Sequence, residues 1–370
     1  MSDNFKNEDY SQYFSAIEKS LKKEASRQAV NPPQKQSSSK KLFGGVIKLR
    51  PWVYITAILL LAVIVFIAAL PKKVNAEPNT VSDVKVADNA VSDQNKNTES
   101  KPQYFAKIID KTQEVAADIV SESVIFVNCD TNEVVASKNA DKRCYPASTT
   151  KIMTILTAVD YITDYNQTFT FSYEITDPFF EQQATMAGFS NGEEVNIIDM
   201  LYGAILPSGA DATAGIALTI AGSEQEFVKL MNKKADELGL KDTNFTNASG
   251  LFDPNHYTTA EDMAVIIRAA SNNELCRKIL STYQYTTAKT PQHPEGILLT
   301  STLFSHMYGT EPEGSDILGG KTGFVSESGY CIASFGKSDG GAEYVCVTFK
   351  GAGLWPTVYD QINLYSYYAK

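Results

Sequence analysis

The hydrophobic and polar positions divide the chain into segments of different expected structure. Trp52 to Leu70 form an uncharged run of nineteen residues, long enough to cross a hydrocarbon core of about 30 Å as a helix. Before it, "YSQYFSAIEKSL" carries apolar residues at helical spacing, and "NPPQKQSSSKK" then breaks the pattern. Residues 71–104 are polar and lack a sustained apolar period. The pattern predicts a membrane-spanning helix followed by a flexible linker.

From about Tyr104 the pattern becomes that of a globular domain. "SVIFVN" and "EVVAS" predict a strand pair around the turn "CDTN". A mostly helical middle follows, with "NIIDMLYGAIL", "DATAGIALTIAG" and "SEQEFVKLMNKKADELGL". "DILGGKTGF", "GYCIASF" and "AEYVCVTF" predict three late strands, and "WPTVYDQINLYSYYA" predicts a closing helix. We therefore expect an α/β fold in which one antiparallel sheet is flanked by helices and carries a helical subdomain.

These segments define four predicted regions: a cytoplasmic tail (1–51), a transmembrane helix (52–70), an extracytoplasmic linker (71–104) and a catalytic domain (105–370). Four basic residues precede the apolar run closely and two follow it, which places the N-terminus in the cytoplasm. The alternative is a cleaved signal peptide, since "VNA" fits a cleavage site. A leader of fifty residues and a long apolar run favour an uncleaved anchor. Either way, the domain is expected outside the cell membrane.

Charge and cysteine content narrow the possible partners. The chain has a net charge of −10, with +5 in the first fifty residues and −15 in the rest, so no nucleic-acid partner is expected. The apolar stripe of the tail fits either a helix on the membrane surface or one that binds a cytoplasmic partner. Cys331 and Cys346 flank a predicted hairpin and could form a bridge. Cross-strand bridges are usually strained, so buried free thiols are the favoured interpretation.

Several common enzyme chemistries find no support in the sequence. His256, His293 and His306 are the only histidines, and no HExxH or comparable ligand spacing occurs. No G-x-S-x-G nucleophile elbow and no Walker-type phosphate loop are present. A zinc hydrolase, an α/β-hydrolase and a nucleotide-binding enzyme are therefore disfavoured, and no metal or cofactor is expected.

The segment "PASTTKIMT" places a serine three residues before a lysine, where a loop becomes an apolar-periodic helix. Ser148 and Lys151 then share one helix face, so the amine can reach the hydroxyl. A lysine displaced towards its neutral form by burial and nearby positive charge can act as the general base for that serine. Taken alone, S-x-x-K is a weak signal that occurs by chance in many chains, and a helix start with Ser148 as the N-cap is the favoured interpretation.

Two later segments add to this pair. "LPSGADA" places Ser208 in a loop between helices, and "GGKTGF" places Lys321, Thr322 and Gly323 on an expected strand. Alone, the first fits a helix cap and the second a glycine turn. In this order, "YPASTTKIMT", "NIIDMLYGAILPSGADA", "FTNASGLFDPNHYTTAEDMA" and "GGKTGFVSESGYCIAS" resemble the signature blocks of serine-type D-Ala-D-Ala carboxypeptidases, the low-molecular-mass penicillin-binding proteins. The resemblance covers roughly residues 104–370.

The resemblance implies a role for each matching residue. Ser148 would be the acyl nucleophile, Lys151 its base, and Ser208 a proton relay to the leaving D-alanine. Lys321 and Thr322 would bind the substrate carboxylate by charge and hydroxyl. The backbone N–H groups of Ser148 and Phe324 would form the oxyanion hole. The strand carrying Lys321 would hold the stem peptide by strand addition. The implied partners are peptidoglycan stem peptides ending in D-Ala-D-Ala, and β-lactams that acylate the serine.

One position departs from the family pattern. The middle motif is usually Ser-x-Asn, whereas this chain has Ser208-Gly209-Ala210. Losing a buried hydrogen-bonding group costs roughly 1–3 kcal/mol, a ten- to hundredfold rate loss. Asp211 is adjacent, but helix geometry is expected to point its side chain elsewhere. The departure predicts altered activity or specificity in an enzyme that keeps its nucleophile and base.

Three functions are weighed on these grounds. The leading hypothesis is a membrane-anchored D,D-carboxypeptidase that removes the terminal D-alanine from stem peptides. A β-lactamase would need a base for the deacylating water, and no glutamate-bearing motif of that kind lies between Ser208 and Lys321. The third reading is a penicillin-recognising sensor or scaffold with weak or no hydrolysis, which the tail stripe and Ala210 favour slightly.

Overall fold

The computed structural model describes residues 104–370. The predicted cytoplasmic tail (1–51), membrane span (52–70) and linker up to residue 103 lie outside the described residues. Within 104–370, no helix has both the length and the apolar character that a membrane crossing requires.

The described part is organised around a sheet of six strands. Their order across the sheet is β1 (Gln113–Glu114), β3 (Glu133–Lys138), β2 (Ser123–Asn128), β10 (Glu343–Gly351), β9 (Gly329–Ser338) and β8 (Ser315–Val325). Short β1 pairs in parallel with β3, and all other neighbours are antiparallel. The predicted sheet of two early and three late strands is confirmed, and β8, which carries the K-T-G segment, forms one edge.

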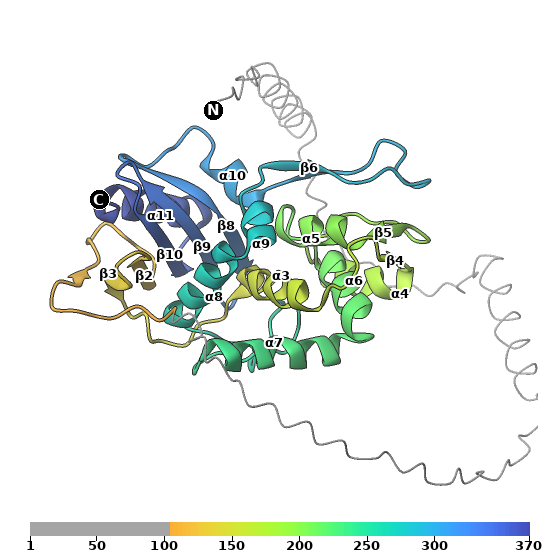
Figure 1. Cartoon of the computed structure of the whole chain (residues 1–370), viewed down its shortest axis with the longest axis horizontal. Helices are drawn as coiled ribbons and strands as arrows, with labels where there is room; N and C mark the ends of the chain where they lie inside the picture. The colour runs from red at the N-terminus through yellow and green to blue at the C-terminus, as the bar shows by residue number, and fades with distance from the viewer. Residues whose placement is uncertain (1–103) are drawn as a thin grey trace, which may run out of the picture. The chain divides into compact units, whose positions relative to one another are not determined.

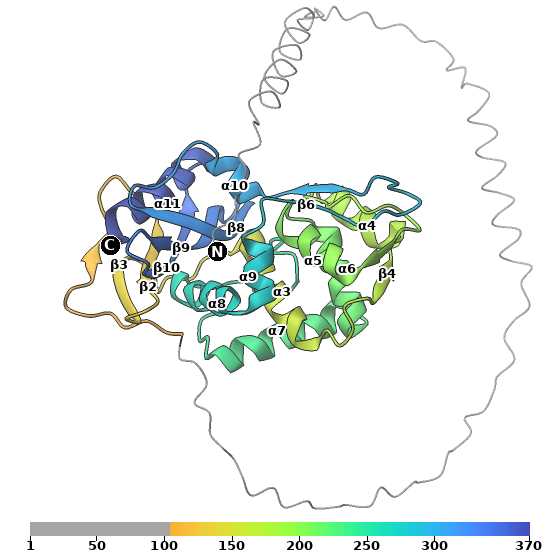
Figure 2. The ribbon, with the colours of Figure 1, turned by 45° about the horizontal axis from the view of Figure 1, so that its top comes forward.

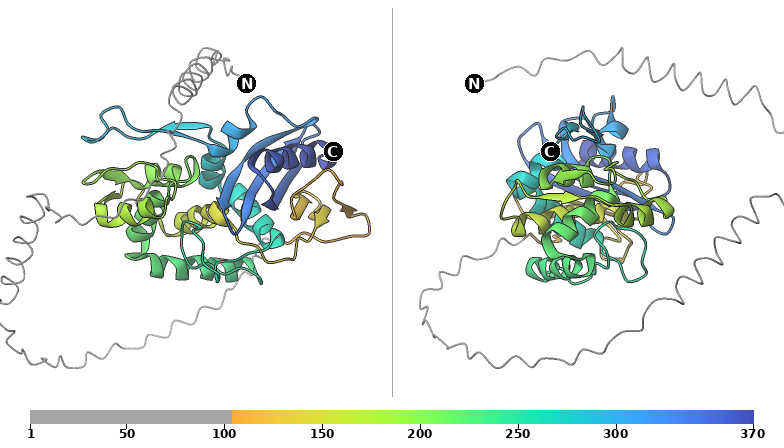
Figure 3. Two further views of the ribbon diagram at one scale, coloured as in Figure 1. Left: turned by 180° about the vertical axis from the view of Figure 1, so that it is seen from behind. Right: turned by 90° about the vertical axis from the view of Figure 1, so that its right-hand side faces the viewer.

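Both faces of the sheet are buried, which explains why its strands read as nearly continuous apolar runs. Ile125 and Val127 of β2 pack into the large core on the side of helix α8 (Ala260–Asn272). Val124 and Phe126 point the opposite way, against the closing helix α11 (Leu354–Tyr368). Figures 1 and 3 show α11 lying along the sheet.

The chain between β3 and β8 forms two small hairpins and the described helices other than α11. The helices are η1 (Ala147–Thr149), α3 (Thr150–Tyr161), α4 (Tyr173–Glu181), α5 (Ile197–Ile205), α6 (Ala210–Ala221), α7 (Glu224–Leu238), α9 (Glu274–Leu280) and α10 (Thr302–Met307), besides α8. The hairpins are β4 (Thr168–Thr170) with β5 (Glu194–Asn196), and β6 (Gln284–Thr286) with β7 (Leu298–Thr300). Helices α4, α5 and α6 with β4 and β5 form the predicted helical subdomain beside the sheet (Figure 1).

The β6–β7 hairpin, residues 284–300, reaches from the sheet across the helical subdomain, and we call it the arm (Figure 2). Asp199 of α5 accepts hydrogen bonds from the Tyr285 hydroxyl at 2.6 Å and from the Ala288 N–H at 2.9 Å. The Tyr285 ring stacks on that of Tyr202, with centroids 3.9 Å apart. The arm was not predicted from the sequence.

All five cysteines of the chain lie in the described part and are free thiols. Cys346 stands opposite Ser334 in the β9–β10 register, so it does not face Cys331 across the hairpin. The favoured prediction of buried free thiols is confirmed for four of them, and Cys129 is partly exposed.

Candidate active site

Ser148 lies in the single turn of η1, directly before α3, and faces Lys151 from there. The Lys151 Nζ is 2.9 Å from the Ser148 Oγ, as the spacing of three residues predicted. The Ser148 hydroxyl makes no capping hydrogen bond, so the N-cap interpretation is wrong. The preceding Ala147 has a φ of +48°, a strained conformation of the kind that clusters at functional sites.

The lysine is almost completely buried, with 2% of its surface exposed. Its Nζ also donates to the Ser249 carbonyl at 2.6 Å. Burial lowers the pKa of Lys151 to about 7, and the negative charge of Asp211 partly opposes this shift. The expected burial of Lys151 is confirmed. The neighbouring charge that shifts its pKa is the negative charge of Asp211, and not the positive charge that we expected. Near neutral pH a large fraction of this amine is uncharged and able to accept a proton.

Ser249 is a contact that the sequence analysis missed. Its carbonyl belongs to a tight turn in which the Asn247 side chain accepts the N–H of Gly250 at 2.7 Å. Gly250 has a φ of +83°, and a Cβ there would lie 1.9 Å from the Ala147 oxygen. The Asn-x-x-Gly spacing is a turn signal, but it does not tell which carbonyl meets the lysine.

Ser208 lies at the start of the second motif, 7% exposed and with a φ of +71°. Two residues on, Ala210 begins α6, and its N–H donates to the Thr185 carbonyl at 2.8 Å. Its methyl group supplies no polar atom to the site. Asp211 is fully buried, and its carboxylate accepts the N–H groups of Ala187 at 2.7 Å and Gly188 at 3.0 Å. As expected, this side chain does not replace the missing asparagine.

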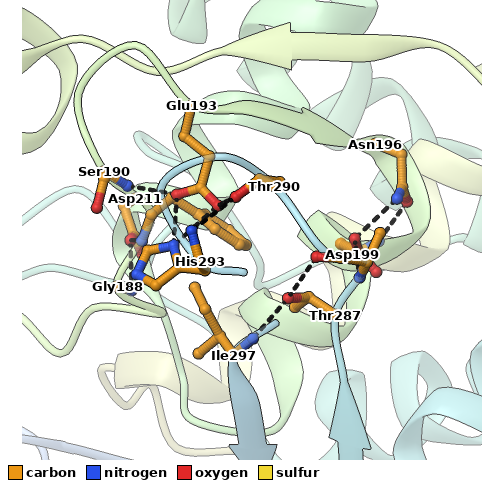
Figure 4. Close-up of polar contacts among 12 residues, drawn as sticks. Gly188, Ser190, Glu193, Asn196, Asp199, Asp211, Thr287, Thr290, His293 and Ile297 are labelled. Carbon is orange, nitrogen blue, oxygen red and sulfur yellow. Dashed lines mark hydrogen bonds and ion pairs between the residues drawn. The ribbon is translucent and has the colours of Figure 1, made fainter. Parts of the chain in front are cut away.

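Asp211 thereby fixes one part of residues 182–193, which we call the wall loop because its first four residues line the active cleft. The other end is held by Glu193, whose buried carboxylate accepts the Ser190 N–H at 2.7 Å (Figure 4). The Thr290 hydroxyl and the His293 Nδ1 of the arm lie 2.7 and 2.9 Å from the same carboxylate. Burial alone would raise the pKa of Glu193, but these hydrogen bonds hold it below the usual value. Two buried carboxylates thus order the wall loop.

The edge strand β8 carries the third motif. Lys321 is 1% exposed, and its Nζ donates to the Thr322 carbonyl at 2.9 Å. Burial, and then the charge of Lys151, hold the pKa of Lys321 well below its usual value. The Thr322 hydroxyl lies 2.8 Å from that of Thr302 on α10, a second contact that the sequence did not reveal. Because any threonine can supply such a hydroxyl, nothing in the sequence indicated that Thr302 is the partner of Thr322.

Gly323 explains the close packing of β8 on η1, which carries Ser148. A Cβ at this position would lie 2.8 Å from the Ser148 nitrogen and 3.0 Å from the Thr149 nitrogen. Such contacts are shorter than real Cβ atoms make, so only glycine allows β8 to lie this close to η1. The backbone that lies against Gly323 is therefore that of η1 and the residue before it.

These elements surround an open cleft of about 460 Å³. It is lined by five residues named in the sequence analysis, namely Ser148, Lys151, Ser208, Ala210 and Phe324. Lys321 and Thr322 do not line it; they lie behind Phe324 along the same strand. The structure therefore brings the serine, the lysine and the second serine to one cleft, between the edge of the sheet and the wall loop.

His256 belongs to the support of this site. Its Nδ1 accepts the Thr246 N–H at 3.1 Å, so its proton is assigned to Nε2, which lies 2.8 Å from the Thr150 hydroxyl. Burial lowers the pKa of His256 to about 4, so the ring is neutral. In residues 104–370, no group of three or more His, Cys, Asp and Glu side chains is placed to hold a metal ion.

The fold and the serine–lysine pair in its cleft define the class of the penicillin-binding serine acyltransferases. The family model of peptidase S11, described as D-alanyl-D-alanine carboxypeptidase, matches residues 110–352. The chain belongs to this family. It is 33% identical over 249 residues to D-alanyl-D-alanine carboxypeptidase DacF of Bacillus subtilis, covering 67% of this chain and 61% of DacF. DacA of Haemophilus influenzae is 29% identical over 254 residues, 63% of this chain and 59% of DacA. The matches thus span about three-fifths of these relatives.

Solved structures show the same fold. The crystal structure of the Streptomyces K15 DD-transpeptidase matches with a TM-score of 0.61 and 26% identity, over 69% of this chain and 99% of that one. The D-alanyl-D-alanine carboxypeptidase from Mycobacterium tuberculosis matches with a TM-score of 0.59 and 25% identity, over 69% and 94% of the two chains.

Proposed function

We propose that this protein is a membrane-anchored serine carboxypeptidase that removes the terminal D-alanine from peptidoglycan stem peptides ending in D-Ala-D-Ala. The observation that carries the proposal is the Ser148–Lys151 pair, with Oγ and Nζ 2.9 Å apart and a lysine pKa of about 7. A serine becomes a nucleophile only when a base takes its proton, and a buried lysine near neutrality meets that need. The family and the relatives' names support the choice of substrate.

In the proposed reaction, Lys151 takes the hydroxyl proton while the Ser148 Oγ attacks the carbonyl of the penultimate D-alanine. The backbone N–H groups of Ser148 and Phe324 stabilise the developing oxyanion, and loss of one such donor costs on the order of 3 kcal/mol. Ser208 passes a proton to the nitrogen of the leaving D-alanine. Water then hydrolyses the ester on Ser148, which frees the shortened peptide.

The substrate carboxylate is assigned to the β8 end of the site. Lys321 contributes positive potential there and Thr322 its hydroxyl, already paired with Thr302. Burial lowers the pKa of Lys321 and so favours its uncharged form. The paired hydroxyls of Thr322 and Thr302 therefore contribute much of the binding of the substrate carboxylate.

Ala210 supports a second candidate, a penicillin-recognising sensor or scaffold with weak hydrolysis. It begins α6 at the cleft without an amide, and no neighbouring carboxamide replaces it among the hydrogen bonds of Lys151. A slow acyl-enzyme is the expected consequence if this position matters for turnover.

The test is D-alanine release from a pentapeptide ending in D-Ala-D-Ala, using the full-length protein in detergent beside its Ser148→Ala variant. Release by the wild type alone supports the carboxypeptidase. Acylation of Ser148 by penicillin without D-alanine release would instead favour the sensor. Rapid turnover of penicillin would identify a β-lactamase.

A further inference from the structure

Ser208, the proposed proton relay, has a backbone conformation that a serine rarely adopts. Its φ of +71° lies in the left-handed region, which is sparsely populated by residues that carry a Cβ. Within residues 104–370 its hydroxyl makes no hydrogen bond, so the backbone determines where this hydroxyl lies. Such a strained conformation persists only where the surrounding structure fixes it. Neighbouring groups therefore hold Ser208 in place.

The wall loop is one of these neighbours. Gly209 packs so closely on the loop that a Cβ there would lie 2.6 Å from the Ala187 nitrogen. The Ala210 N–H donates to the Thr185 carbonyl at 2.8 Å. Both residues that follow Ser208 are thus fixed by the wall loop. A displacement of the loop would allow the strained turn to relax.

The arm holds the other end of the wall loop. The buried Glu193 carboxylate accepts the Ser190 N–H of the loop and the Thr290 hydroxyl of the arm (Figure 4). Its two oxygens lie 2.9 and 3.0 Å from the His293 Nδ1, so this nitrogen carries a proton and donates it. A buried carboxylate that loses such donors is strongly destabilised where it lies. Loss of the arm's donors would therefore release Ser190.

The arm is itself held at its tip and at its root. At the tip, the Thr290 N–H donates to the His293 carbonyl at 3.1 Å, and the His293 N–H donates to the Thr290 hydroxyl at 3.0 Å. At the root, the N–H of Thr302 donates to the Leu206 carbonyl at 3.0 Å. Leu206 lies two residues before Ser208. The arm thus reaches the Ser208 region from both ends, directly at its root and through the wall loop at its tip.

We propose that His293 is a positioning residue for Ser208. Together with the Thr290 hydroxyl it holds Glu193, and Glu193 keeps the wall loop against the turn that follows Ser208. The arm thereby controls the rate of acylation, because a reacting group displaced by about 1 Å loses much of its effect. This inference rests on the proposed function, in which Ser208 passes a proton to the leaving nitrogen.

Acylation of the full-length protein in detergent by a fluorescent penicillin measures this role. His293→Gln removes the donor at the Nδ1 position and should slow acylation about ten- to hundredfold. His293→Asn keeps an N–H group near that position and should retain most of the rate. The matched control is Tyr285→Phe, which removes a hydrogen bond of the arm that goes to Asp199 and not to the wall loop. It should acylate like the wild type.

Two further measurements separate positioning from a general loss of structure. In a Ser208→Ala background, followed over longer reaction times, His293→Gln should slow acylation no further, because the residue that it positions is absent. Hydrogen exchange followed by mass spectrometry should show faster exchange of the wall loop in His293→Gln. His293→Asn and Tyr285→Phe should leave that exchange unchanged.

Acylation of His293→Gln at the wild-type rate would overturn the proposal, as would an equal slowing in both backgrounds. So would unchanged exchange of the wall loop, or a His293→Asn variant as slow as His293→Gln. D-alanine release by the wild type, measured in parallel, tests the proposed function separately. Acylation that depends on His293 and Ser208 in this way, without D-alanine release, would refute the carboxypeptidase and support the positioning role.

Discussion

At the scale of single residues, the site depends on how Lys151 is surrounded. Burial lowers the pKa of Lys151, and the negative charge of Asp211 raises it by a smaller amount. The S-x-x-K spacing predicted that the two side chains could meet, because three residues on a helix determine the distance, and the two later motifs singled this pair out from chance occurrences. Ser249 and Thr302 could not be predicted, because one contributes a carbonyl that every residue has and the other a common hydroxyl.

The pKa of Lys151 gives acylation a defined pH dependence. Below about pH 7 the amine is protonated and cannot accept the Ser148 proton, so the rate of labelling by a fluorescent penicillin should rise with pH through a midpoint near 7. Asp211→Asn removes a negative charge that raises this pKa, so the midpoint should move to lower pH. Stopped labelling reactions at a series of pH values measure both midpoints.

The matched control for that experiment is Asp199→Asn. Asp199 is also a buried carboxylate, but it accepts hydrogen bonds from Asn196 and from the arm, and its charge is not one that shifts the pKa of Lys151. Its midpoint should equal that of the wild type. An unchanged or raised midpoint in Asp211→Asn would contradict this electrostatic assignment.

At the scale of elements, the sequence predicted the helices and strands whose apolar residues recur at helical or strand spacing. The early strand pair, the three late strands, α5 to α7 and α11 are all confirmed. The arm was missed because its two strands have only three residues each, and its contact to Asp199 spans 86 positions of the chain. The wall loop is likewise ordered by carboxylates whose burial no local pattern reveals.

The contact between β8 and η1 leads to a sharp prediction at this scale. Gly323→Ala would place a methyl group against the backbone nitrogens of Ser148 and Thr149, so one element must shift. We expect a loss of about 1–3 kcal/mol in the free energy of unfolding. The displaced nucleophile should acylate on the order of 100-fold more slowly. Denaturant unfolding and penicillin labelling measure the two effects.

Gly340→Ala is the control for this change, because Gly340 lies in the exposed β9–β10 turn and its added Cβ would meet only the Ser338 hydroxyl at 3.6 Å. It should leave acylation unchanged. Wild-type acylation by Gly323→Ala would show that η1 tolerates a wider gap from β8 than the distances indicate.

At the scale of the whole molecule, the proposed function requires the catalytic domain to reach the cell wall. The proposed substrate, a peptidoglycan stem peptide, is extracytoplasmic, so the proposed function requires the domain to lie beyond the membrane. The uncharged run from Trp52 to Leu70 and the polar residues 71–103 offer an anchor and a spacer of suitable character. We therefore propose a single span with the N-terminus in the cytoplasm, as the basic residues before the run favour.

This topology predicts which part of the chain an external protease can reach. In intact spheroplasts, added protease should digest the catalytic domain and spare an epitope fused to Met1, because the bilayer shields only the tail.

The basic residues before the apolar run should set this orientation. Replacing Lys40, Lys41, Lys48 and Arg50 by glutamine removes the charge bias and leaves Lys72 and Lys73 beyond the run. A fraction of the chains should then insert in the opposite orientation and lose penicillin labelling from outside. Glutamine at Lys6, Lys19, Lys22 and Lys23 removes the same number of charges further from the run and should preserve the orientation. Digestion of the epitope in the unmodified protein, with the domain protected, would contradict the anchor's direction. An epitope missing from mature protein would instead identify cleavage after the apolar run.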